Sequence, residues 1–94
     1  MNTLSFEVFQ ANALRAGFDE VLERQWAPNA VIETHCHAFG VEAVVVQGDM
    51  WLSGEGYVRH LAVGDTFKLI AHEPHAERYG AQGATYWAAR KNLR

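Results

Sequence analysis

The chain has 94 residues, of which 49% are apolar, and its eight basic and eleven acidic side chains give a formal net charge of −3; this material predicts one hydrophobic core and a single domain over residues 1–94. The basic residues are scattered apart from a short C-terminal group, which argues against a surface for nucleic acid or an anionic membrane. No apolar run is long enough to span a bilayer, the N-terminus has no signal-peptide pattern, and the single cysteine cannot form an internal disulfide, so we expect a cytoplasmic protein.

Hydrophobic alternation and turn residues divide the chain into roughly eight short extended segments. In chain order, these predicted strands are residues 4–9, 31–37, 41–46, 50–52, 57–61, 66–70, 75–79 and 84–90. Glycine-containing turn signals recur about every ten residues, and Gly48-Asp49 is one of them. Short strands with regular turns are typical of an antiparallel sandwich or barrel.

The N-terminal third is less regular than the rest. Residues 4–9 alternate apolar and polar side chains and predict an edge strand, whereas residues 10–17 suggest one helical turn that is too short to be stable alone. The next segment alternates with Phe18, Leu22 and Trp26 as candidates for its buried side.

Two histidines, His35 and His37, are separated by one residue in a predicted strand. Because successive side chains of a strand point to opposite faces, both imidazoles share one face and can present two nitrogens to one divalent metal ion. A third imidazole, from His75, and a carboxylate, from Glu42 or Glu77, would complete a mixed N/O site of the kind that first-row metals take. The alternative is a polar pocket of hydrogen-bonded imidazoles without a metal.

Two motifs in this sequence resemble those of the cupins. The first, in residues 35–48, is an H-x-H pair followed by Glu42 and a glycine; the second, in residues 64–79, has a Gly-Asp turn and closes on Pro-His. The resemblance implies an all-β fold, a small antiparallel jelly-roll β-barrel, with one divalent ion (manganese, iron, nickel or zinc) at its centre. The ligands it implies are His35, His37, an acidic residue, for which we choose Glu42, and His75.

Three positions depart from the cupin pattern. Glu42 lies six residues before Gly48, where the family usually leaves seven, and a one-residue shift reverses the facing of a strand side chain. Glu42 therefore points inward only if a bulge near residues 38–41 absorbs the difference. His72-Glu73 stands where a glycine usually precedes the Pro-His pair, and Tyr79 replaces an expected asparagine.

Glu77 and His72 are the candidate catalytic residues. Glu77 lies two residues after His75, on the same strand face, and is suited to bind the metal, to orient an imidazole or to act as a general acid or base. His72 sits near the rim, and its alternative role is that of an ordinary loop histidine. Tyr79 continues the same face, and a core tyrosine with its hydroxyl paired is the favoured interpretation.

The sequence thus predicts a metal-binding small cupin that binds a small polar metabolite, with a metal-dependent oxygenase or isomerase as candidate activities. The alternative is a non-catalytic module that senses or binds a ligand. No motif selects a reaction, a substrate or a metal, and none decides whether the protein is an enzyme. The aromatic residues exceed what a small barrel interior needs, so we expect some at a subunit contact and predict a homodimer. These residues are Trp26, Trp51, Trp87, Phe6, Phe9 and Phe18.

Overall fold

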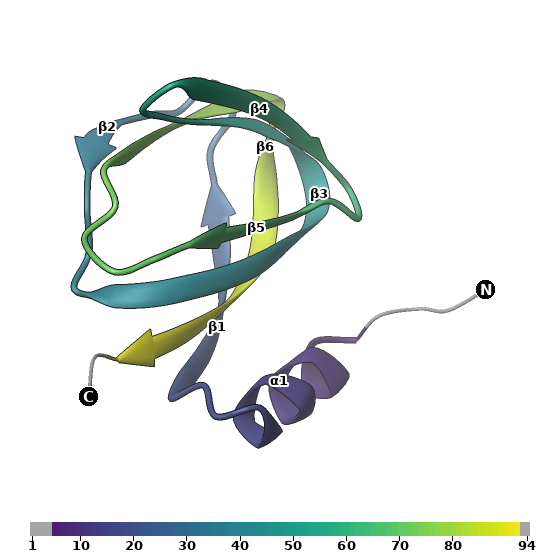
Figure 1. Cartoon of the computed structure of the whole chain (residues 1–94). Coiled ribbons are helices and arrows are strands. Elements are labelled where there is room, and N and C mark those ends of the chain that lie inside the picture. The colour runs from purple at the N-terminus through teal and green to yellow at the C-terminus, as the bar shows by residue number, and fades with distance from the viewer. Residues whose placement is uncertain (1–4, 93–94) are drawn as a thin grey trace.

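The computed structural model describes residues 5–92, which form one helix and six strands (Figure 1). In chain order, the elements are α1 (Phe6–Arg15), β1 (Glu20–Trp26), β2 (Val31–His35), β3 (Phe39–Gly54), β4 (Tyr57–Ala62), β5 (Thr66–Leu69) and β6 (His75–Asn92). The predicted all-β class is therefore confirmed. Within the described residues, no helix is long and apolar enough to cross a membrane.

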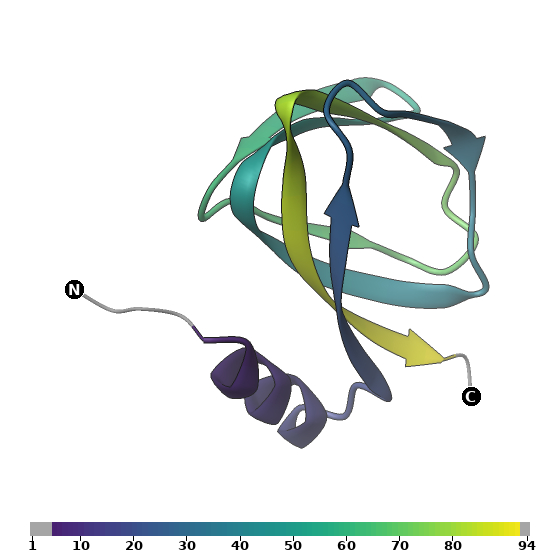
Figure 2. The same ribbon diagram turned by 180° about the vertical axis from the view of Figure 1, so that it is seen from behind.

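The six strands belong to one antiparallel sheet built around β3 and β6. The strand order is β1-β6-β3-β4, with β2 added beside the first half of β6 and β5 beside the first half of β3. Seen from both sides, the sheet curls around a central space while α1 lies outside it (Figures 1 and 2). The backbone pairing does not close into a ring, so the molecule is an open jelly-roll barrel.

The curl depends on two long strands that bend where the sequence predicts turns. β3 continues without interruption through Gly48, and register shifts on both sides of this residue mark bulges in its pairing with β6. Gly48 has a φ of 71°, and a Cβ atom there would collide with the carbonyl oxygen of Gly83 on β6. A glycine bulge therefore replaces the predicted turn. β6 continues through Gly80 and Gly83 in the same way, so the predicted strands 41–46 and 50–52 form one strand, and so do 75–79 and 84–90.

The predicted edge strand over residues 4–9 is wrong, because its described part enters α1; residue 4 lies outside the described residues. The hydroxyl of Ser5 caps the helix by accepting a hydrogen bond of 3.2 Å from the backbone N–H three residues later. Phe6 and Phe9, three apart, both reach the indole of Trp87, with ring centroids 5.7 and 6.0 Å away. A spacing of three residues puts both rings on one face of a helix, whereas in a strand they would point to opposite faces.

The core fills the space between the two halves of the barrel with apolar side chains from β3, β4, β5 and β6. Its fully buried members include Val45, Met50, Leu52, Leu61 and Tyr79. Trp87 lies on the outer face of the sheet beneath α1, so the helix covers part of the aromatic surplus. The homodimer stays a prediction.

Candidate metal centre

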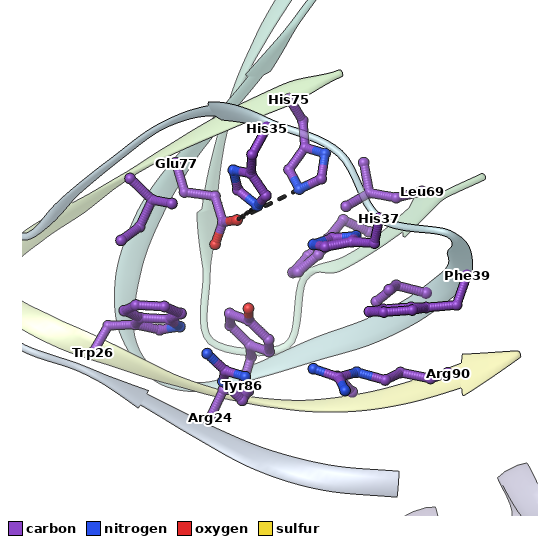
Figure 3. A pocket seen from close by; sticks show the side chains of 14 residues that line it. Arg24, Trp26, His35, His37, Phe39, Leu69, His75, Glu77, Tyr86 and Arg90 are labelled. Atoms are coloured by element: carbon purple, nitrogen blue, oxygen red, sulfur yellow. Dashed lines mark ion pairs between the residues drawn. The ribbon is translucent and has the colours of Figure 1, made fainter. Parts of the chain in front are cut away.

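Three imidazoles converge on the inner side of the barrel (Figure 3). His35 ends β2, His37 follows it, and His75 begins β6; the antiparallel register of the two strands places His35 opposite His75. The ring centroid of His35 lies 4.3 Å from that of His75 and 5.0 Å from that of His37, and the third distance is 4.8 Å. The potential ligand atoms all lie within 4.8 Å of one another, so together they could hold one metal ion.

The backbone fixes the orientation of two of these rings. Nδ1 of His35 donates a hydrogen bond of 2.8 Å to the carbonyl of Glu33, and Nδ1 of His75 donates one of 2.9 Å to the carbonyl of Glu73. A carbonyl oxygen only accepts, so Nδ1 carries the proton in both rings and the neutral imidazole keeps its lone pair on Nε2. Nε2 of His75 is buried and has no hydrogen-bond partner among the described residues.

A buried carboxylate faces these nitrogens. Oε2 of Glu77 lies 3.7 Å from Nε2 of His35 and 3.6 Å from Nε2 of His75. The other carboxylate oxygen, Oε1, accepts a hydrogen bond from the hydroxyl of Tyr79. Burial and the adjacent carboxylate raise the pKa of Tyr79 above its ordinary value, so the phenol stays protonated and remains a donor. Tyr79 thus has the paired core hydroxyl that its sequence position suggests.

The donor set fits a divalent metal of the first transition row. Oε2 of Glu77 faces Nε2 of His35 and Nε2 of His75, and both distances are longer than a hydrogen bond. Ligands about 2.0–2.2 Å from a tetrahedral ion lie roughly 3.3–3.6 Å apart, close to the 3.6 and 3.7 Å separations from Glu77. A cation among these atoms would satisfy the buried Nε2 of His75, which has no hydrogen-bond partner within residues 5–92.

His37, like His35, is half-buried. Its ring stacks on Phe39 at 4.7 Å with an interplanar angle of 9°. Desolvation by burial, together with the charges of the nearby His75, His35, Arg90 and Arg24, lowers the pKa of His37 to about 4. The imidazole is therefore neutral at neutral pH, the protonation state in which a histidine binds a metal.

The imidazoles open onto a cavity of about 80 Å³ inside the barrel. Drug-sized ligands occupy sites of about 300–1,000 Å³, so this space suits a molecule of only a few non-hydrogen atoms. Apart from the three histidines and Glu77, its polar lining consists of Arg24, Tyr86 and Arg90. The apolar wall comprises Trp26, Ile32, Phe39, Val41, Phe67, Leu69 and Ala88.

Solved structures share this architecture. KdgF from Halomonas sp. superposes with a TM-score of 0.70 and 24% identity over 79% of this chain and 68% of that one. An RmlC-like cupin from Shewanella frigidimarina superposes with a TM-score of 0.69 and 20% identity, over 79% of this chain and 66% of that one. The chain has the cupin fold. Oxalate decarboxylase from Bacillus subtilis, in a structure concerned with its Mn(II) centres, superposes with a TM-score of 0.70 and 19% identity, over 84% of this chain and 22% of that one.

These similarities are a matter of fold. No protein-family model and no curated protein sequence matches the chain. The chain covers about two thirds of the length of the first two structures and about a fifth of the third. The cupin fold accommodates many reactions, so the role of this barrel has to be argued from its own residues.

The structure does not bring Glu42 to the imidazoles. Glu42 is exposed, whereas Val41 and Ala43 on either side of it are buried. The strand is regular here, pairing residue by residue with β5, so no bulge turns Glu42 inward. The carboxylate beside the imidazoles belongs to Glu77, and the geometry gives no support to Glu42 as a ligand.

His72 also lies away from the cavity. It is an exposed loop residue with a φ of 68°, and its backbone N–H donates a hydrogen bond of 2.6 Å to the carbonyl of His37. Its imidazole does not line the cavity. The backbone of His72 therefore ties two loops together near the centre, while its side chain is not placed for catalysis there.

Two residues that line the cavity, Arg24 and Arg90, are not among the site residues predicted from the sequence. A signal for both is present, because Arg24 shares the alternation of Leu22 and Trp26, which are candidates for the buried side of their segment. Arg90 likewise shares the face of Tyr86, two pairs of positions earlier in β6. An arginine near the end of a strand is usually solvated, so the sequence alone does not predict that these two side chains point into the barrel.

Proposed function

We propose that this protein is a metal-binding cupin whose centre acts on a small polar metabolite. The metal ligands are His35, His37 and His75, and Glu77 is the carboxylate of the site. The coordination of an ion by three imidazoles and one carboxylate leaves positions for a substrate or water. Oxygenation and isomerisation remain the candidate reactions.

One observation carries this proposal: Nε2 of His75 is buried, has no hydrogen-bond partner in the described part of the chain and lies 3.6 Å from a buried carboxylate. A buried polar atom without a partner is costly. The backbone hydrogen bond at Nδ1 holds the ring in this orientation, as outer hydrogen bonds do for metal-binding histidines. A cation at this point would remove the cost.

The chain's own residues supply the rest of the chemistry. A bound divalent ion would polarise an oxygen atom of the substrate. Tyr79 donates to Oε1 of Glu77 and orients the carboxylate, which leaves Oε2 turned toward the imidazoles. Oε2 is thus the atom that either binds the ion or takes a proton from a nearby substrate. The apolar wall limits the access of water to this atom.

The solved structures support the proposal at the level of the fold. Oxalate decarboxylase, a protein described with Mn(II) centres, superposes on this chain over 22% of its own length with a TM-score of 0.70. The low identity and the small share of that protein covered mean that its reaction is not transferred here.

Turnover measurements test the function. Protein loaded with Mn²⁺, Fe²⁺, Ni²⁺ or Zn²⁺ would be incubated with small hydroxy acids, diketones and sugars, with and without oxygen, and the products identified by mass spectrometry. We expect a product that chelation abolishes and that the metal restores. Stabilisation by a compound without any product would contradict catalysis and indicate a ligand-sensing module instead.

A further inference from the structure

Two guanidinium groups line the cavity across from His75 (Figure 3). Arg24 is in β1 and Arg90 is in β6, and the antiparallel register of these strands pairs Arg24 with Tyr86 and Glu20 with Arg90. Both arginines therefore occupy the inner face of the same two-stranded ribbon. They lie near enough to His37 to help lower the pKa of its imidazole.

These charges are only weakly compensated within the described residues. Among residues 5–92, Arg24 has no carboxylate within ion-pair distance, and Arg90 pairs only with the exposed Glu20 at 3.7 Å. Exposed pairs of this kind contribute little. In the part of the chain that the structure describes, Glu77 is the one carboxylate that lines the cavity, and it is turned toward the imidazoles. The two arginines therefore outnumber the single carboxylate among the described residues that line the cavity.

Aromatic rings hold both guanidinium groups in place. Arg24 lies over the ring of Trp26 at 5.0 Å, and Arg90 lies over the ring of Phe39 at 4.5 Å. Stacking occupies the flat face of a guanidinium and leaves its N–H edge free for hydrogen bonds. That edge matches the two oxygen atoms of a carboxylate.

We propose that the cavity selects a short metabolite bearing a carboxylate, which binds to Arg24 and Arg90 while its other polar end faces the imidazoles. This inference rests on the proposed function of the same site and names its substrate class. The cavity volume of about 80 Å³ restricts the ligand to a few non-hydrogen atoms. The competing explanation is that the arginines only cover Trp26 and Phe39 and take no part in binding.

Matched pairs of ligands separate these explanations. Acetate, glycolate, lactate and succinate would be titrated beside the corresponding primary amides, using calorimetry on the wild type and on Arg24→Gln, Arg90→Gln and Arg78→Gln. Arg78 provides the control because it is exposed and stacks on Trp51 at 4.1 Å, outside the cavity.

We expect at least one carboxylate to bind the wild type and the Arg78→Gln variant about tenfold more tightly than its amide. This preference should fall by about tenfold in Arg24→Gln and Arg90→Gln, while the binding of the amide stays the same. The proposal is overturned if the wild type prefers no carboxylate, a comparison that needs no variant. It is equally overturned if the cavity variants behave like Arg78→Gln, which would mean that a metal alone binds the carboxylate.

Each titration would be run on Mn²⁺-loaded and on metal-free protein, which separates this inference from the proposed function. A chain that takes up no metal but still shows an arginine-dependent preference for carboxylates would refute the metal centre and support the anion site. A chain that binds metal without such a preference would support the metal centre and refute the anion site.

Discussion

His75 and Glu77 share the inner face of β6, with Nε2 of the imidazole 3.6 Å from Oε2 of the carboxylate and both side chains buried. Their two-residue spacing in one strand brings them together. The bond from Nδ1 to the backbone leaves a lone pair on Nε2 of the neutral ring, so two acceptors face each other in a poorly hydrated interior. A proton or a metal ion between them is needed to offset this arrangement.

Replacement of Glu77 by glutamine should weaken metal binding about 10- to 100-fold, because the amide keeps the shape but removes the charge. Titration of the protein against a fluorescent chelator would measure the change in Kd. Glu42→Gln is the matched control, since Glu42 is exposed on the outer face, and its Kd should equal that of the wild type. Equal affinities of both variants would show that Glu77 has no part in the centre.

Replacement of Tyr79 by phenylalanine should lower the free energy of unfolding of metal-free protein by about 1–3 kcal/mol. The substitution leaves Oε1 of Glu77 buried without the hydroxyl that donates to it. Tyr57→Phe is a suitable comparison, because its hydroxyl donates over 3.3 Å to the less buried Glu73, and its cost should be smaller. Urea titration would measure the free energy of unfolding of both variants. An equal loss of this free energy in the two would argue against a special role for the buried pair of Tyr79 and Glu77.

Replacement of Gly48 by alanine should destabilise the barrel by about 3–5 kcal/mol. The new Cβ would meet the carbonyl of Gly83, at a residue whose φ of 71° already disfavours a side chain. Gly64→Ala, at φ 95° with open space around it, carries only the backbone strain and should cost about 1 kcal/mol. Similar melting temperatures for the two variants would contradict the bulge as the element that bends β3.

Much of the barrel could be predicted from local patterns in the sequence. The alternating segments over residues 57–61 and 66–70 identify β4 and β5 correctly, because a half-buried strand imposes a period of two. The glycines at 48, 80 and 83 could not be interpreted in this way. A glycine in a bulge and a glycine in a turn look alike until the partner strand is known.

In the candidate centre, too, some residues could be predicted from local sequence spacing and others could not. His35, His37 and His75 were identified from the H-x-H spacing and the Pro-His pair, and the structure gathers them at one point. The choice between Glu42 and Glu77 depended on strand facing, which a single bulge would have reversed. The inward positions of Arg24 and Arg90 required the register of β1 on β6, a long-range pairing that local spacing does not reveal.

The metal content of purified protein is the most direct test of this centre. The wild type, His37→Ala, His75→Ala and the control His60→Ala would be exposed to Mn²⁺, Fe²⁺, Ni²⁺ and Zn²⁺ in turn, desalted, checked for folding by circular dichroism and measured by plasma mass spectrometry. His60 is exposed and pairs with Asp49 at 2.6 Å, outside the cavity. We predict about one ion per chain in the wild type and in His60→Ala, with nearly complete loss in folded His37→Ala and His75→Ala. Metal-free wild type under all four conditions, or variants that retain as much metal as the wild type, would contradict a centre built on these imidazoles.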